Sequence, residues 1–152
     1  MSKKLKLFYF ELLVPLILGF AVLDWTSAHK FIELIPPKFS ETAGSLLFIL
    51  CGAFSIAFPI SYRSLFAYKS ESHSGISQKE FLKFEQTLIG FTMVATFIAF
   101  LTYIFGLPRF YTAGAILLSL CALYYFFPSR LRIAFDQKIY KTIFINARKI
   151  LF

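Results

Sequence analysis

Side chains that most often carry enzyme chemistry are scarce in this chain. Its 152 residues include two histidines, two cysteines and eight acidic residues. No set of them has the spacing of a zinc site, which needs three or four convergent protein ligands. His29 and His73 fall in loops on opposite sides of the long apolar runs, which disfavours haem ligation by a histidine pair. We therefore expect no metal ion, no cofactor and no catalytic residue.

Motifs that bind phosphates or activate a serine are also missing. The sequence contains neither a phosphate-cradling glycine loop nor a serine-elbow motif. Cys51 and Cys121 both lie inside apolar runs, where cysteines usually behave as small hydrophobic residues. A redox pair is the alternative interpretation of these two thiols.

Apolar residues, in contrast, are abundant. Hydrophobic residues make up 58% of the chain and charged residues 16%, against about 45–50% and about 25% in soluble domains. Four apolar runs, each near the 17–25 residues that cross a bilayer, cover residues 7–25, 43–62, 88–105 and 110–127. The sequence predicts an all-α membrane protein. Residues 1–127 form a four-transmembrane-helix bundle in an inner or plasma membrane.

The basic residues indicate how the chain is threaded. Thirteen of the sixteen Lys and Arg fall in the N-terminus, the middle loop and the C-terminal segment, whereas Lys30, Lys38 and Arg109 fall on the other side. Because basic residues near span ends favour the cytoplasmic side, both termini are predicted to be cytoplasmic. The same distribution accounts for the net charge of +8 without a nucleic-acid partner.

Local signals predict two helix boundaries. Ser77 followed by Glu80 matches a capping box, so a helix is expected to begin there and enter the membrane near Phe84. Gly106 and Pro108 predict a tight hairpin, in which the glycine ends one helix and the proline begins the next.

Small residues recur along three of the predicted spans, and such stripes let membrane helices approach closely. We expect these three helices to form the core, and the first helix to be the most peripheral. The stripes comprise Ser45, Gly52 and Ser55; Thr92, Ala95, Ala99 and Thr102; and Thr112, Ala115, Ser119 and Ala122.

The segment 128–152 is predicted to be a basic amphipathic helix on the cytoplasmic surface. Its apolar side would carry Phe135, Ile139 and Ile143, and Arg132 would pair with Asp136 one turn later. Such a helix binds anionic headgroups; docking on a partner subunit and a flexible tail are the alternatives. The candidate lipid-binding residues are Arg130, Lys138, Lys141, Arg148 and Lys149.

Two carboxylates are candidates for an ion site or a polar subunit contact. Glu11 lies about one turn inside the first span, and burying an ionisable residue in a membrane is costly. Lys4 is on roughly the same face and can help to neutralise it. Glu85 lies at a similar depth, so the two acids are candidates for one cluster.

These features favour a non-catalytic integral-membrane subunit or scaffold protein. It would assemble with other membrane subunits, or with copies of itself, through its small-residue faces and basic tail. One alternative is a small oligomeric channel or transporter that uses Glu11. A second is a lipid-processing enzyme with Asp24, His29 and Arg109 on the outer face.

Overall fold

Helix accounts for almost all of the described residues. The computed structural model describes residues 2–28, 41–72, 76–140 and 142–143. The elements in chain order are α1 (Ser2–Ala28), α2 (Glu41–Gly52), the π-helical segment η1 (Ala53–Ala57), α3 (Phe58–Ser72), β1 (Ile76–Ser77), α4 (Gln78–Ile104), α5 (Arg109–Tyr125), α6 (Arg130–Ile139) and β2 (Thr142–Ile143).

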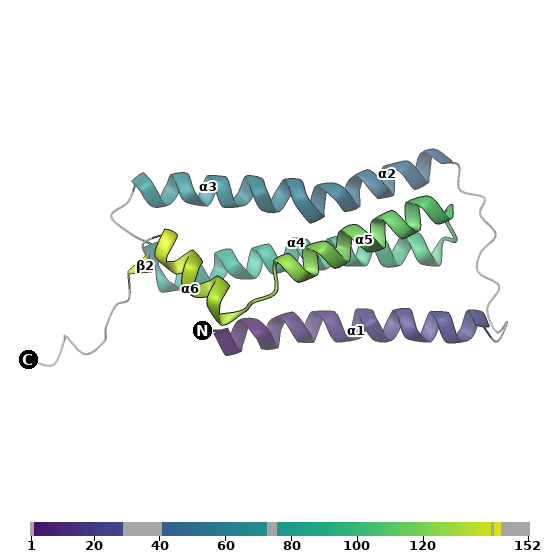
Figure 1. The fold of residues 1–152 in the computed structure, drawn as a ribbon, viewed down its shortest axis with the longest axis horizontal. Coiled ribbons are helices and arrows are strands. Elements are labelled where there is room, and N and C mark those ends of the chain that lie inside the picture. Colours follow the sequence, from purple (N-terminus) through teal and green to yellow (C-terminus); the bar gives the residue numbers. More distant parts are fainter. Residues whose placement is uncertain (1, 29–40, 73–75, 141, 144–152) are drawn as a thin grey trace, which may run out of the picture.

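The helix α4 is central, because it contacts α1, α2, η1, α3 and α5. Figure 1 shows α1 on one side of α4 and α5, with α2 and α3 on the other. Successive long segments run in opposite directions, so the start of α1, the end of α3, the start of α4 and α6 share one end. We call this the α6 end, and the opposite end, where α4 turns into α5, the hairpin end.

Three helical segments are long and apolar enough to cross a membrane: Lys3–Thr26, Thr42–Ser70 and Gln78–Ile104. The pair α5 and α6 passes the same test only together, with a bend of 73° between them. The expectation of an almost entirely helical chain is therefore confirmed. Of the four expected spans, three meet this criterion as single helices and the fourth does so only as the bent pair. Each of these three candidate spans also begins or ends beyond the apolar run that was predicted for it.

Both predicted helix boundaries are present. The Ser77 hydroxyl accepts a hydrogen bond from the backbone N–H of Glu80, and the Glu80 carboxylate accepts one from the Ser77 N–H. At the hairpin end Gly106 has φ 58°, a left-handed conformation that glycine adopts without a Cβ penalty. The N–H of Gly106 bonds to the carbonyl of Tyr103, and that of Leu107 to the carbonyl of Thr102, which is a Schellman helix end.

The π-helical segment η1 was not anticipated from the sequence. It interrupts α-helical spacing just before Pro59, and the N–H of Phe58 bonds to the carbonyl of Ala53, five residues earlier. Pro59 has no N–H to donate to the carbonyl of Ser55, and its ring clashes with a regular preceding turn. The widened turn lets the helix continue through the proline.

The predicted C-terminal helix is too long. α6 begins after Ser129, whose hydroxyl accepts a hydrogen bond from the N–H of Arg132 at 3.1 Å, but it ends at Ile139. Tyr140 then packs edge-on against Phe66 and Phe84, with ring centroids 5.1 and 5.3 Å apart. Tertiary packing thus ends the helix where the local amphipathic pattern would continue it.

A short parallel pairing follows. β2 lies beside β1, with Thr142 opposite Ile76 and Ile143 opposite Ser77. Ile143 is therefore in a strand and not on the apolar face of a helix. Residues 144–152, which include Arg148 and Lys149, and Lys141 lie outside the described residues.

Candidate functional site

Four charged side chains form a cluster at the α6 end. Asp136 of α6 accepts a hydrogen bond from the Arg63 guanidinium of α3 at 2.5 Å. The Arg132 guanidinium pairs with Glu85 of α4, and its Nε lies 3.6 Å from Asp136 Oδ2. Both carboxylates are fully buried. The cluster joins α3, α4 and α6.

The charges in this cluster balance, since two guanidinium groups face two carboxylates. Removing charges from water costs several kcal/mol per ion, and close pairing must offset that cost. One oxygen of Glu85 nevertheless has no hydrogen-bond partner among the described residues. The cluster ties α6 to α3 and α4, because the buried Glu85 and Asp136 carboxylates find their cationic partners across these helices.

The local pairing of Arg132 with Asp136 matches the expectation from their spacing. The structure also shows which way α6 faces. Ile133 and Asp136 face the bundle, whereas Leu131, Phe135 and Ile139 are exposed. The apolar side expected from the sequence therefore points away from the protein, because the charge cluster occupies the inward face.

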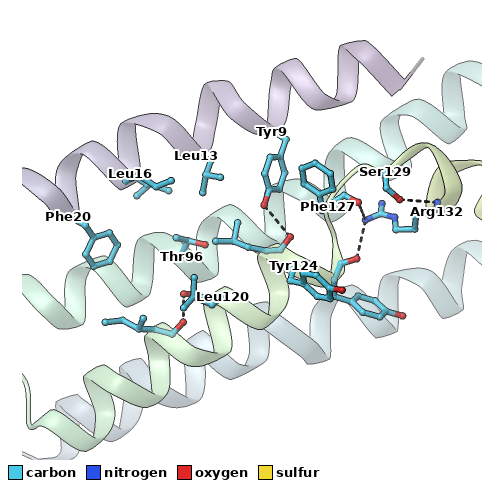
Figure 2. A pocket seen from close by; sticks show the side chains of 15 residues that line it. Tyr9, Leu13, Leu16, Phe20, Thr96, Leu120, Tyr124, Phe127, Ser129 and Arg132 are labelled. Atoms are coloured by element: carbon cyan, nitrogen blue, oxygen red, sulfur yellow. Dashed lines mark hydrogen bonds between the residues drawn. The ribbon is translucent and has the colours of Figure 1, made fainter.

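An apolar groove adjoins the charge cluster. It lies between α1 and α5 over α4 and has a volume of about 730 Å³. Figure 2 shows Leu13, Leu16 and Phe20 of α1 along one wall, with Thr96 on α4 and Leu120 on α5. At the α6 end the groove reaches Ser129 and Arg132. The cluster residue Arg132 is thus also part of the groove lining.

One hydrogen bond crosses the groove. The Tyr9 hydroxyl of α1 donates to the carbonyl of Leu123 on α5 at 3.1 Å (Figure 2). Leu123 is in the last turn of α5, where backbone carbonyls lack intrahelical donors; the N–H of Phe127, four residues on, bonds instead to Tyr124. The Tyr9 hydroxyl therefore supplies a donor to a carbonyl that lacks one in its own helix, and this bond joins α1 to α5.

Part of the predicted small-residue stripes lies where three helices meet. Ala95, Ala99 and Ala115 form one buried cluster with Cys51, whereas Ser119 lines the groove between α1 and α5. α2, α4 and α5 all contact one another. The predicted stripe residues are buried at Ser55, Thr92, Ala95, Ala99, Thr102, Ala115, Ser119 and Ala122, and partly buried at Ser45, Gly52 and Thr112.

The centre of that crossing is Cys51. Its sulfur lies 3.5 Å from the carbonyl oxygens of Ala95 and Ala115. Cys121 is exposed, and both thiols are free. A second close approach was not expected: a Cβ added to Gly114 would lie 2.6 Å from a ring carbon of Phe48, whereas one on Gly52 would meet Leu118 at 3.8 Å.

Glu11 and Glu85 are not brought together. Glu85 is buried against Arg132, whereas Glu11 is exposed on α1 beside Leu7, Phe10 and Val14. No basic side chain in the described part of the chain forms an ion pair with Glu11. The proposed single cluster of acids is wrong, because the two side chains face different surroundings.

Of the three outer-face candidates, the structure describes Asp24 and Arg109, and no ion pair joins these two. Asp24 accepts a hydrogen bond from the Tyr103 hydroxyl at 3.2 Å, and Arg109 is exposed at the start of α5. His29 lies outside the described residues. Of the expected lipid-binding residues, Arg130 and Lys138 are exposed on α6.

The geometry defines a helical bundle with three or four segments long and apolar enough to cross a membrane. No group of three His, Cys, Asp or Glu that could hold a metal ion occurs among the residues that the structure describes. Comparison with protein-family models, curated proteins and solved structures finds no match to this chain.

Proposed function

We propose that this chain is a non-catalytic integral-membrane protein that acts as an accessory or scaffold subunit of a membrane complex. It crosses an inner or plasma membrane four times, and both termini are cytoplasmic. Large apolar side chains that remain exposed along the bundle support insertion, among them Ile17, Leu18, Ile49 and Leu117. Hydrocarbon, not water, is the solvent that suits such a surface.

The position of α6 supports a cytoplasmic interface at the α6 end. α6 lies at 73° to α5, which places it nearly parallel to the membrane surface if α5 crosses the membrane. Its exposed face carries Leu131, Phe135 and Ile139, beside exposed Arg130 and Lys138. This combination favours an interfacial helix that contacts acyl chains and anionic headgroups.

One observation carries the proposal of a subunit: Glu11 is an exposed carboxylate on a face of α1 that also carries Leu7, Phe10 and Val14, with Lys3 and Lys6 nearer the start of the helix. Intramembrane acidic residues usually face a protein partner or a water-filled cavity, because lipid exposure is costly. α1 is also the least buried of the three long spans, and it packs mainly against α4. Its outer face is therefore the surface that a second subunit would cover.

Topology is tested with single cysteines at Arg109 and Lys138, in a Cys51→Ala, Cys121→Ala background. An impermeant thiol reagent added outside intact cells should label position 109 and leave position 138 unlabelled until the membrane is opened. Labelling of both positions from one side contradicts the four-crossing arrangement.

The subunit role is tested by native mass spectrometry of the chain ejected directly from its own membrane. We expect an assembly of defined stoichiometry that dissociates on Glu11→Gln but persists on Glu11→Asp, which retains the charge. Leu117→Ala, on the exposed face of α5, serves as the control for a general loss of apolar surface. A solitary chain in every variant contradicts the proposal.

A further inference from the structure

The groove between α1 and α5 has the length of one membrane leaflet. Its lining extends along α1 from Tyr9 to Phe20, which is about 16 Å at 1.5 Å per residue. Half of a hydrocarbon core of about 30 Å is about 15 Å. The groove begins at the α6 end, so it spans the depth that one acyl chain of that leaflet occupies.

The floor of the groove is suited to hydrocarbon. The hydroxyls of Thr96 and Ser119 both lie in the lining, but each donates to a carbonyl of its own helix, at 2.9 and 2.8 Å. These donors are therefore already satisfied, and the rest of the floor and walls is aliphatic or aromatic. Leu120 and Tyr124 stay 56% and 88% exposed, so the groove is open along its side to surrounding lipid.

Two cationic side chains lie at the α6 end of the groove. Among the described residues that line the groove, Arg132 is the charged one, and its carboxylate partners Glu85 and Asp136 are not part of that lining. Its Nη1 contacts the carbonyls of Tyr125 and Phe127 only at 3.5 Å, a long distance for a hydrogen bond. Lys6 adds a second cation, 5.6 Å from the ring centroid of Phe127, which also lines the groove.

We propose that this groove binds one acyl chain of an anionic phospholipid, whose phosphate lies against Arg132 and Lys6. The volume is within the roughly 300–1,000 Å³ of small-molecule sites. An anionic oxygen replaces the two long contacts of Arg132 with a charge-assisted hydrogen bond. The inference rests on the proposed insertion of the α6 end into the inner leaflet, and it adds a specific lipid site to that arrangement.

The test uses tryptophan quenching by phospholipids with brominated acyl chains. In a Trp25→Phe background, Leu120→Trp places the probe in the groove lining. Leu117→Trp places it one turn away on the same helix, exposed and outside the lining. The full-length chain is reconstituted in vesicles that contain either a brominated anionic phospholipid or a brominated zwitterionic one, at equal mole fraction.

From the quenching of the tryptophan at position 120, we expect the groove to bind the anionic lipid about fivefold more strongly than the zwitterionic lipid. One basic group near the surface contributes about 1 kcal/mol, which corresponds to that ratio. At position 117 the two lipids should quench equally. The paired variant Glu85→Gln, Arg132→Gln removes one of the two cations without leaving Glu85 charged and unpaired, and should reduce the preference; Lys6→Gln in the same chain should abolish it. Circular dichroism of that variant checks that the helices are retained.

The other outcomes separate this inference from the proposed function. Equal quenching by both lipids at both positions means ordinary lipid contact and overturns the site. Displacement of the anionic phospholipid by an equimolar fatty acid assigns the groove to a different ligand and also overturns it. Absence of quenching at both positions contradicts membrane insertion itself, and with it the lipid site.

Discussion

Two regions of the bundle hold three helices together by different means. Where α2, α4 and α5 cross, the contact is made by small groups: Cys51 lies 3.5 Å from the backbone of Ala95 and of Ala115. At the α6 end the contact between α3, α4 and α6 is made by paired charges, with Arg63 2.5 Å from Asp136. The crossing of α2, α4 and α5 depends on small side chains, whereas the contact at the α6 end depends on the pairing of opposite charges.

In the proposed membrane arrangement, the difference follows from the surroundings of each region. Deep in a bilayer, lipid competes equally for apolar surface, so helices associate through close backbone approach. Near the interface, charged groups are less costly and can specify one arrangement, provided that each has its partner. A substitution should therefore be most damaging in the charge cluster, less damaging at the small-residue crossing, and least damaging at exposed pairs.

The largest effect is expected for Asp136→Ala. Loss of this carboxylate leaves Arg63 and Arg132 with excess buried positive charge, which typically costs about 3–5 kcal/mol of unfolding free energy. Denaturant titration in lipid bicelles, followed by circular dichroism, measures the change. Lys138→Ala, an exposed basic residue on the same helix, is the control. If Asp136→Ala lowers the unfolding free energy no more than Lys138→Ala does, the cluster does not stabilise α6.

The crossing of α2, α4 and α5 is tested with Ala95→Leu. The added carbons have no free volume beside Cys51, and overpacking of this kind costs about 1–3 kcal/mol. The matched control is Val94→Leu, at the neighbouring position that faces outward. The same titration should show a lower unfolding free energy for Ala95→Leu and no change for Val94→Leu. Equal losses in the two variants contradict close packing at position 95.

The link between α1 and α5 is tested with Tyr9→Phe. It removes the hydroxyl that satisfies the Leu123 carbonyl, for which we expect a loss of about 0.5–1.5 kcal/mol. Hydrogen exchange should become faster at the end of α5. Tyr124→Phe removes a hydroxyl from an exposed ring on α5 and should leave exchange unchanged. Identical exchange in the two variants argues against the bond.

The smallest effect is expected for Lys69→Gln. Lys69 pairs with Glu80 at 3.4 Å, but both side chains are at least half exposed, and such pairs contribute about 0–1 kcal/mol. Raising the salt concentration should reduce the difference from the unsubstituted chain, because screening weakens exposed pairs. A loss comparable to that of Asp136→Ala would remove the distinction between buried and exposed charges.

Features set by neighbours in the chain were predictable. Apolar runs of sufficient length indicated the long helices, Ser77 and Glu80 indicated a helix start, and Gly106 indicated a helix end. The π-helical segment had a local signal as well, in Pro59, but a proline alone does not reveal whether a helix breaks, kinks or widens. The stripes of small residues indicated the crossing of three helices, because their spacing alone places them on one face of each helix.

Features set by residues far apart in sequence were not predictable. Glu85 was associated with Glu11 by depth alone, whereas its partner is Arg132, 47 residues along the chain. The aromatic contact that ends α6 depends on Tyr140 meeting Phe66 and Phe84, which belong to two other helices. No spacing rule relates these positions.

The amino-acid sequence therefore determined which segments are apolar helices and where several of them begin and end, because those properties depend on residues within one or two turns. Only the tertiary structure decided which way α6 faces, which charges pair, and that a groove remains between α1 and α5. These depend on how separate helices meet, since the same Arg132 serves as a local partner of Asp136, a distant partner of Glu85 and the charged end of the groove.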